Sequence, residues 1–355
     1  MSGRHARPMS RRSFLTVCGA VVAAGLAGLV RAVWPSRGID LASTASPPAR
    51  IPASPAPSPV STPTPTPSPS RQTLVIHGAG DTNLDPSVIT TFRTHGYDYA
   101  WSGMHGLFQR DDLTIVNCEC AVSTLGTKVP GKSFNFRGDP AALPAMRTAG
   151  VDVANLGNNH AYDFGPTALL DTRKNLLANG IAPVGAGKDP AAANAPALFE
   201  VKGWTIAVVG FDKVVDPFPE AVAAPGHPGT ADGHDENRMV AAVRAAKRDA
   251  DLVIVAIHWG VELDTQPRPD DVLLGRRLVD AGADVIFGGH AHRLQPVGTH
   301  GDRPIFYGLG NFVWQNLSVA GSTTAVAEVR VTPQGKIVPK LLPAYIQATG
   351  HPVLV

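Results

Sequence analysis

The 355-residue sequence predicts an α/β fold in which two β-sheets pack face to face between outer helices. Short apolar runs, each long enough for one buried strand, end in polar residues at 74–77, 113–116, 151–154, 252–257 and 285–287. Residues 237–248 and 270–281 have apolar side chains at helical spacing, which predicts outer helices. Residues 71–355 are long for one domain, but their length is normal for a large sandwich with a single core.

Further strand-like segments at 197–201, 205–211, 305–309 and 323–331 favour a second sheet, antiparallel in part, packed against the first. The polar ends of the five apolar runs matter most for function. Loops at the carboxyl ends of parallel strands are where α/β folds build their active sites. We therefore expect the side chains at these strand ends to lie together.

The first apolar run is followed by Gly78, Gly80 and Asp81. Glycine lets the backbone turn sharply, so we expect the strand to end at this point and the turn to expose Asp81. The second run leads into Asn117 and Glu119. Because side chains alternate along extended backbone, these two should share one face, with the intervening cysteine on the other.

Six residues at five strand ends are predicted metal ligands: Asp81, Glu119, Asn159, His258, His290 and His292. Carboxylate, amide and imidazole groups together suit Mn²⁺, Fe²⁺ or Zn²⁺, whereas a Ca²⁺ site would offer oxygen alone. A mixed set of this size favours two divalent ions. Two ions can activate water and stabilise both the attacking and the leaving oxygen of an ester. The chemistry this implies is hydrolysis, most naturally of phosphoesters.

Each motif alone has a simpler interpretation. Asn158-Asn159-His160 at a strand end is more often a turn with local side-chain hydrogen bonds. A single His258 is more often a core histidine with satisfied hydrogen bonds. His290 and His292 are a stronger indication, since two histidines at i and i+2 on extended backbone project to one side. The occurrence of all these motifs in order along one chain favours a metal site over the simpler interpretation of each motif.

The ordered motifs resemble those of the CapA (PgsA) family of capsule and poly-γ-glutamate synthesis proteins, which has the calcineurin-like metallophosphoesterase fold. The resemblance covers about residues 73 to 315 and is specific because six motifs occur in order. They are Gly80-Asp81, Asn117-x-Glu119, Asn158-Asn159-His160-x-x-Asp163-x-Gly165, His258-Trp259-Gly260-x-Glu262, Gly282-Ala283-Asp284 through His292 to Gln295, and Tyr307-x-Leu309-Gly310-Asn311-Phe312. The family implies a four-layer α/β/β/α sandwich with one catalytic domain.

The resemblance also implies a role for each site residue. It assigns Asp81 and His292 to one ion, Asn159, His258 and His290 to the other, and Glu119 to both as a bridge. His160 would be the catalytic acid for the leaving group, and Asp163 would orient His160 or a ligand. Asn83 stands where the fold commonly has a histidine, so the first ion would lose a ligand or take a weaker amide.

Two residues near the motifs have open interpretations. Arg137 could meet an anionic substrate through its planar guanidinium, and an ordinary surface arginine is at least as good an interpretation. Glu262 could line the cleft, and a solvated loop position is equally plausible.

The amino terminus predicts export. Residues 1–32 contain Arg11-Arg12 followed by an apolar run, a pattern typical of twin-arginine signals, and this segment is either a cleaved signal peptide or an uncleaved anchor. Residues 33–70 are rich in Pro, Ser and Thr and are expected to be a disordered linker, or stalk, before the domain at 71–355. We therefore expect an extracytoplasmic protein of the cell envelope that meets the membrane only through its N-terminal segment.

Composition sets weaker limits. The formal net charge of +2 and the lack of a basic run outside the signal disfavour nucleic-acid binding. Cys118 and Cys120 lie two residues apart, where a disulfide would be strained, so the fold should not depend on one.

Three functions are consistent with the sequence. The first is an exported metal-dependent hydrolase of the metallophosphoesterase type. The second is a component of capsule or poly-γ-glutamate production that acts on an anionic polymer, with a membrane polymer-synthase complex as a partner. The third is a non-catalytic, polymer-binding accessory protein with a relic metal site.

Overall fold

The computed structural model describes residues 70–214 and 218–355, which belong to one compact unit. The predicted signal at 1–32 and all but the last residue of the predicted linker at 33–70 lie outside the described residues. Within the described ranges, no helix is long and apolar enough to cross a membrane.

The first sheet contains the strands that deliver Asp81 and Glu119. Its strands are β1 (Leu74–Thr82), β2 (Leu113–Cys118), β5 (Val153–Asn155), β6 (Ala182–Val184), β15 (Asn311–Val313), β16 (Thr323–Val331), β17 (Ile337–Ala348) and β18 (His351–Leu354). They are ordered β18–β17–β16–β1–β2–β5–β6, and β15 also pairs with β1. Strands β1, β2, β5 and β6 run parallel, whereas β16 to β18 form an antiparallel edge.

The second sheet delivers the histidines. Its strands are β8 (Ala197–Val201), β9 (Trp204–Asp212), β11 (Leu252–His258), β12 (Val285–Gly289), β13 (Val297–His300) and β14 (Arg303–Phe306). They are ordered β13–β14–β12–β11–β9–β8, with parallel central strands and antiparallel edges. Two small pairs lie outside these sheets: β3 (Ala121–Val122) with β4 (Arg137–Gly138), and β7 (Ala186–Gly187) with β10 (Gly229–Thr230).

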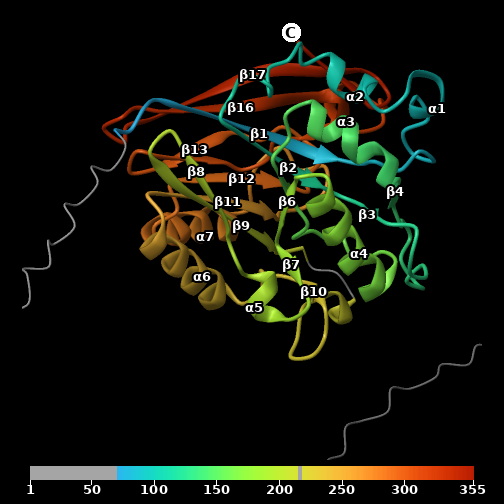
Figure 1. The fold of residues 1–355 in the computed structure, drawn as a ribbon, viewed down its shortest axis with the longest axis horizontal. Coiled ribbons are helices and arrows are strands. Elements are labelled where there is room, and N and C mark those ends of the chain that lie inside the picture. The colour runs from blue at the N-terminus through green and yellow to red at the C-terminus, as the bar shows by residue number, and fades with distance from the viewer. Residues whose placement is uncertain (1–69, 215–217) are drawn as a thin grey trace, which may run out of the picture. The chain divides into compact units, whose positions relative to one another are not determined.

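The helices connect and cover the sheets (Figure 1). They are α1 (Phe92–His95), α2 (Tyr99–Ser102), α3 (Leu143–Thr148), α4 (Gly165–Ala178), α5 (Pro190–Ala193), α6 (Glu236–Asp249), α7 (Pro269–Asp280) and α8 (Val319–Ser322), with 3₁₀ turns at Pro140–Ala142 and Pro219–Ala221. The carboxylate of Asp235 caps α6 by accepting from the backbone N–H of Arg238. Helix α7 begins at Pro269, whose missing N–H costs nothing at a helix start.

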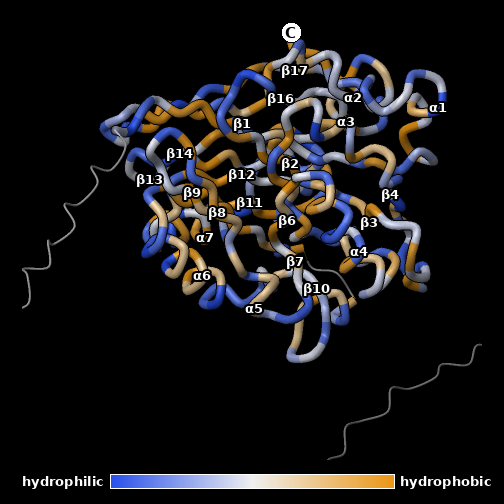
Figure 2. The backbone as a smooth tube through the Cα atoms, viewed as in Figure 1, coloured by the Kyte–Doolittle hydropathy of each residue, from blue (hydrophilic) through white to orange (hydrophobic). Residues whose placement is uncertain are grey.

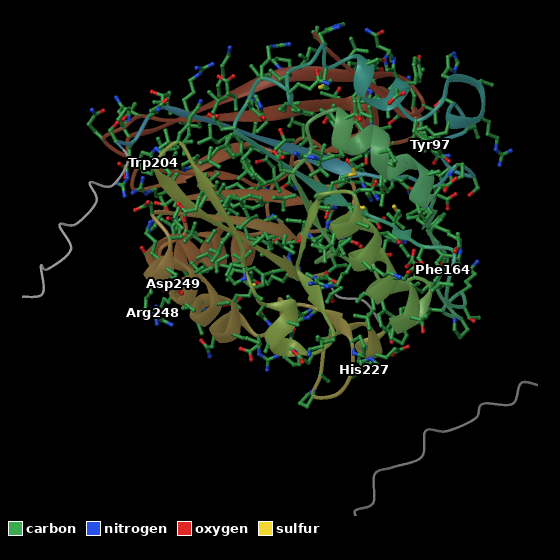
Figure 3. The ribbon with its side chains drawn as sticks, viewed as in Figure 1. Tyr97, Phe164, Trp204, His227, Arg248 and Asp249 are labelled. Carbon is green, nitrogen blue, oxygen red and sulfur yellow. The ribbon has the colours of Figure 1, made fainter. Side chains whose placement is uncertain are left out.

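Three apolar cores separate four layers. On β9, Ile206 and Val208 face the core between the two sheets, whereas Ala207 and Val209 face the core under α6 and α7. A third core lies between the first sheet and helices α2 to α4, and Cys118 of β2 packs into it. Figure 2 shows the apolar strands through the middle of the domain, and the side chains that fill the space between the layers are drawn in Figure 3. The predicted four-layer α/β/β/α sandwich is therefore confirmed.

The prediction that the first strand ends at residue 77 was wrong. Strand β1 continues through the glycines to Thr82, and Asp81 is completely buried. A Cβ on Gly78 would lie 2.7 Å from the ring of Phe287, and a Cβ on Gly80 only 1.9 Å from the carbonyl oxygen of Gly310. These glycines permit close approach of neighbouring segments in extended backbone, and no turn is required.

The predicted second sheet was partly wrong. Residues 197–201 and 205–211 do lie in it, as β8 and most of β9, and residues 305–306 of the predicted 305–309 belong to β14. Residues 323–331 form β16 as expected, but this strand pairs with β1 in the first sheet. The five strands that end at the site are divided between the two sheets. The site therefore lies where the ends of both sheets meet.

Candidate metal centre

The strand registers align the site residues side by side. Asp81 of β1 is paired with Asn117 of β2, which is paired with Asn155 of β5. In the second sheet, His258 at the end of β11 is paired with Gly289 at the end of β12. The structure brings together all six residues predicted as ligands from the sequence.

Asn117 joins the ligands of the two sheets. Its Nδ2 donates to Oδ1 of Asp81 at 2.9 Å and to Oε2 of Glu119 at 3.3 Å, and it lies 3.1 Å from Nδ1 of His258. Its Oδ1 accepts hydrogen bonds from Asn155 and Asn158 at 3.2 and 3.1 Å. The sequence prediction placed Asn117 on the same face as Glu119 but gave it no role. Its position fixes the rotamers of three neighbouring side chains.

Glu119 belongs to two groups of side chains whose ligand atoms lie within 4.8 Å of one another. The first group contains Asp81, Glu119 and His292, and the second contains Glu119, His258 and His290. Oε1 of Glu119 lies 3.4 Å from Nε2 of His258 and 3.7 Å from Nε2 of His292. One carboxylate therefore faces both groups, as a bridging ligand must.

Buried atoms without partners mark the same place. Among the described residues, Oε1 of Glu119 and Nδ1 of His290 have no hydrogen-bond partner although both atoms are buried. A buried polar atom without a partner costs about 1–3 kcal/mol, so a native site needs a compensating interaction. Oδ1 of Asn159 lies beside this group, 3.0 Å from Nε2 of His258. Carboxylate, amide and imidazole donors fit a borderline divalent cation.

Charge and burial act in opposite directions on the first group. Burial raises the pKa of Asp81. The hydrogen bond with His292 and the charge of that ring lower it by more, and the charge of His258 and the hydrogen bond from Asn117 lower it further. The pKa of Asp81 is therefore about 2. Burial and the charge of Asp81 raise the pKa of Glu119 to about 8. Burial lowers the pKa of His292, yet the charge of Glu119 and the contacts with Asp81 raise it to about 9.

The other two histidines favour the neutral state. Burial lowers the pKa of His258 to about 3. Burial and the charges of His258 and His292 lower the pKa of His290 to about 2. Metal ions bind the neutral form of imidazole, so both rings are ready to act as ligands at neutral pH.

The backbone at both downstream histidines is strained. His290 has φ of 94° and His292 has φ of 51°, values that side chains other than glycine rarely adopt. The N–H of His290 points at the Asp81 carboxylate, with an N to Oδ2 distance of 3.3 Å. Nδ1 of His292 lies 3.1 Å from the same carboxylate and 2.8 Å from Oδ1 of Asn311. The prediction that these two histidines lie on extended backbone was therefore wrong: they lie in a turn, and both rings still reach the ligand groups.

His160 and Asp163 form a second cluster beside the ligands. Nδ1 of His160 lies 2.8 Å from Oδ2 of Asp163, a completely buried carboxylate that also accepts from the backbone N–H of Phe136 at 2.6 Å. Nζ of Lys132 lies 2.8 Å from the other oxygen of Asp163 and donates to the backbone carbonyl of Asn159. Lys132 thus connects the His160 cluster to a candidate ligand. Sequence reasoning missed it because a single lysine in a loop has no diagnostic spacing.

The side-chain oxygen of Asn83 accepts from the backbone N–H of Asp85 at 2.8 Å, which closes a local turn. Its Nδ2 is buried without a hydrogen-bond partner among the described residues. The carboxylate and imidazole ligand atoms of the first group come from Asp81, Glu119 and His292.

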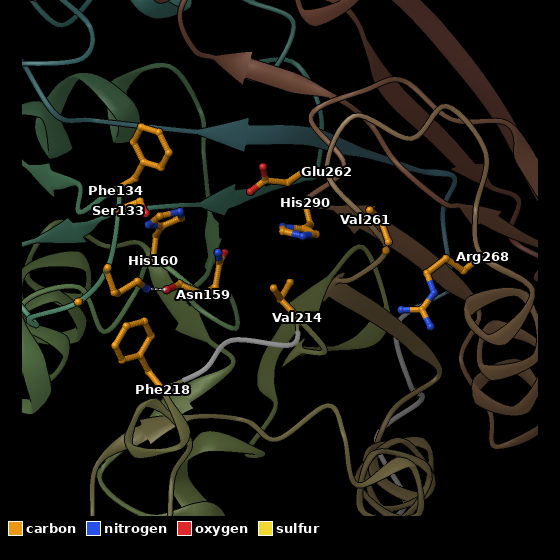
Figure 4. Close-up of a pocket in the computed structure, with 13 residues that line it drawn as sticks. Ser133, Phe134, Asn159, His160, Val214, Phe218, Val261, Glu262, Arg268 and His290 are labelled. Atoms are coloured by element: carbon orange, nitrogen blue, oxygen red, sulfur yellow. Dashed lines mark hydrogen bonds between the residues drawn. The ribbon is translucent and has the colours of Figure 1, made fainter. Parts of the chain in front are cut away.

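A cleft of about 500 Å³ opens above these clusters (Figure 4). Asn159, His160 and His290 form its floor, and the side chains around them are Lys132, Phe134, Val214, Phe218, Val261, Glu262 and Arg268, with Gly131, Ser133 and Gly260 between them. Glu262 fits both interpretations, because it lines the cleft and is exposed in the loop that follows β11. The cleft leads from solvent to His160 and to two of the candidate ligands, Asn159 and His290.

Arg137 lies outside the cleft lining and has a structural role. Its guanidinium donates to the backbone carbonyls of Ser123, Leu125 and Gly126 and stacks on Phe164 at 3.6 Å from the ring centre. Phe164 is labelled in Figure 3. The suggestion that Arg137 binds an anionic substrate was wrong, because its donors already hold a loop.

Comparison with known proteins gives a family match over most of the domain. The model of the family described as bacterial capsule synthesis protein PGA_cap matches residues 75–316. The capsule biosynthesis protein CapA of Bacillus anthracis is 29% identical over 283 residues, which are 78% of this chain and 68% of that protein. The PGA biosynthesis protein CapA of Bacillus subtilis is 30% identical over 237 residues, with 66% of this chain and 62% of that protein covered.

Similarity to solved structures is weaker. The NAD nucleotidase of Haemophilus influenzae aligns over 77% of this chain and 50% of its own, with a TM-score of 0.48 and 15% sequence identity. The chain thus spans half the length of that enzyme, and somewhat less than two thirds of the B. subtilis protein.

Proposed function

We propose that this chain, which belongs to the bacterial capsule synthesis protein family, is a metal-dependent hydrolase or transferase with a two-ion centre, acting in capsule or poly-γ-glutamate production. The supporting observation is the position of Glu119. Its carboxylate is shared by two groups of ligand atoms, and one of its buried oxygens has no hydrogen-bond partner among the described residues. A shared carboxylate between two histidine-containing groups is the arrangement that two adjacent divalent ions require.

The residues that would hold the ions come from both sheets. Asp81 and His292 would bind one, His258, His290 and Asn159 the other, and Glu119 both. Bound there, divalent ions would supply an activated water and positive charge to stabilise the transition state of ester or amide hydrolysis. Mn²⁺, Fe²⁺ and Zn²⁺ all suit this set of donors.

His160 would supply the proton to the leaving group. Because Asp163 occupies its Nδ1, Nε2 is the nitrogen left for the substrate, and His160 lines the cleft beside Asn159. The buried carboxylate keeps the ring in one orientation. Lys132 limits the negative charge of this cluster by pairing with Asp163.

A second candidate function is that of a non-catalytic, polymer-binding accessory protein with a relic site. The position of Asn83 favours it, because this side chain closes a local turn and leaves one group with fewer strong ligands. Such a protein would keep one tightly bound ion, or none, and would use the cleft to hold an anionic polymer.

The place of action is part of the same proposal. The twin-arginine pattern at residues 11 and 12 supports export, and the Pro-rich segment supports a position away from the membrane surface. A phosphoester or an anionic polymer would be the substrate, and a membrane polymer synthase the partner. Changing both arginines to lysine should abolish export. If cells that carry this variant still released active protein, the assignment of the two arginines to an export signal would be wrong.

Elemental analysis of the purified full-length chain would test the proposal directly. It should be paired with hydrolysis assays on bis-p-nitrophenyl phosphate and on poly-γ-glutamate, with and without added Mn²⁺. Two ions per chain and metal-dependent turnover would support the hydrolase, and the preferred substrate would identify its class. Polymer binding without bound metal or turnover would favour the accessory function.

A further inference from the structure

Glu262 is a charged residue of the cleft that the proposed chemistry does not use. It lies four residues after His258, in the loop that follows β11, and lines the cleft together with His160 and His290. Figure 4 shows its side chain between these two histidines, on the same side of the cleft as Phe134. Its charge is among the causes that raise the pKa of Glu119, which places it within electrostatic reach of the candidate ligands.

The carboxylate of Glu262 is available to a ligand. In residues 70–214 and 218–355 no hydrogen bond or ion pair engages it, and the side chain is exposed. The cationic residues of the cleft lining have acidic partners of their own. Lys132 is paired with Asp163 at 2.8 Å, and Arg268 lies 3.6 Å from Asp270. Glu262 therefore presents to the cleft a negative charge that no direct ion pair among the described residues neutralises, although its field also acts on His292 of the ligand groups.

An uncompensated carboxylate beside the site affects substrates of different charge in opposite ways. A phosphomonoester dianion, or a substrate with a carboxylate near the scissile bond, would be repelled by Glu262. A substrate with an ammonium group there would form an ion pair. Phe134 adds to this preference, because its ring is 69% exposed at the cleft and an aromatic face attracts cations. A carboxylate and an aromatic ring together suit an alkylammonium group.

We propose that Glu262 and Phe134 form a cation subsite that selects substrates carrying an ammonium group next to the scissile ester or amide bond. The inference rests on the proposed hydrolase function and narrows its substrate class, because it favours a phosphoester with an ammonium group over poly-γ-glutamate, which has a carboxylate beside each amide bond. Glu262 acts in it as a specificity-determining residue that binds the substrate and takes no proton. The same charge discriminates against phosphomonoester dianions.

Two esters that differ only in charge provide the test. p-Nitrophenyl phosphorylcholine has a trimethylammonium group where p-nitrophenyl 3,3-dimethylbutyl phosphate has a neutral tert-butyl group of the same shape. With the Mn²⁺-loaded full-length chain, the ratio of their kcat/KM values should favour the choline ester by about five- to tenfold, as expected for an exposed ion pair with an aromatic contribution. Glu262→Gln should bring this ratio close to one, mainly through KM.

Further variants separate the contributions. Phe134→Leu keeps an apolar side chain but removes the aromatic face, and should lower the ratio about twofold. Asp302→Asn removes the same charge from an exposed residue outside the cleft lining, and should leave the ratio at the wild-type value. A wild-type ratio of one would overturn the proposal. An equal loss of both activities in Glu262→Gln would also overturn it, since that result assigns Glu262 to the chemical step.

A binding measurement distinguishes failure of this inference from failure of the proposed function. If neither ester is hydrolysed, the hydrolase proposal fails, and calorimetry with phosphocholine and 3,3-dimethylbutyl phosphate still reports on the subsite. Tighter binding of phosphocholine that is lost in Glu262→Gln would support the cation subsite. Equal binding of the two ligands, or binding of neither, would refute it.

Discussion

Asp163 holds the imidazole of His160 through a 2.8 Å contact between Oδ2 and Nδ1, and the carboxylate itself is completely buried. The N–H of Phe136 and the ammonium of Lys132 fix the carboxylate from two other sides. The orientation of His160 is therefore set by side chains and backbone outside the ligand set, although Lys132 also donates to the backbone carbonyl of Asn159. Turnover and metal binding should be separable by mutation.

His160→Ala should keep the metal content of the wild-type protein and lower kcat by about 10²- to 10⁴-fold, the usual contribution of a general acid. Asp163→Asn should lower kcat less, because the imidazole remains but loses its orienting carboxylate. Kinetics on bis-p-nitrophenyl phosphate together with elemental analysis would measure both effects. Wild-type activity in His160→Ala would show that another group protonates the leaving group.

His290→Ala should reduce the bound metal. Its Nδ1 is buried with no hydrogen-bond partner among the described residues, so truncation removes a ligand that no neighbouring side chain is placed to replace. The content should fall from two ions to one per chain. His234→Ala, which alters an exposed histidine away from the candidate ligands, is the matched control and should retain both. An unchanged content in His290→Ala would remove this residue from the ligand set.

Metal affinity should increase with pH. In the metal-free site, burial and the charge of Asp81 raise the pKa of Glu119 to about 8, and the pKa of His292 is raised to about 9. Both groups therefore hold protons at pH 7, and a binding ion must displace them. Affinity should rise between about pH 7 and pH 9 and level off above. Calorimetry in buffers of different ionisation enthalpy would count the released protons, and a pH-independent affinity would contradict the assignment.

Gly80→Ala should destabilise the fold by at least about 3 kcal/mol, because the new Cβ would lie 1.9 Å from the carbonyl oxygen of Gly310 and backbone cannot move aside as a side chain can. Gly275→Ala is a suitable comparison. Its Cβ would lie 3.2 Å from the flexible end of Ile305, and alanine favours the helix by about 1 kcal/mol. Denaturant unfolding would compare the two variants. Equal stability would show that β1 can shift away from Gly310.

The strands and the ligand set could be predicted because both depend on local pattern. Short apolar runs marked β2 and β11 almost to the residue, and alternation along β2 placed Glu119 opposite the core-facing Cys118. Cys118 and Cys120 are both free and buried. The ordered motifs then indicated which strand ends lie together.

The errors came from properties that depend on distant neighbours. Glycines at 78 and 80 resemble a turn in sequence, and only the positions of Phe287 and Gly310 show that they permit close packing. Alternation identified β16 as a strand but could not select its partner sheet. The same limit applies to Asn117 and Arg137, because their roles are defined by side chains and carbonyls that fold against them.

The division of the ligands between the two sheets has a consequence for assembly. Asp81 and His290, whose backbone N–H contacts the Asp81 carboxylate, are 209 residues apart in the chain. Neither group of ligand atoms is complete within one sheet, since each combines Glu119 with a histidine from the second sheet. A chain synthesised only as far as His258 still lacks His290 and His292, so neither group is complete at that stage. Metal binding would therefore follow the folding of both sheets and would link them at the cleft.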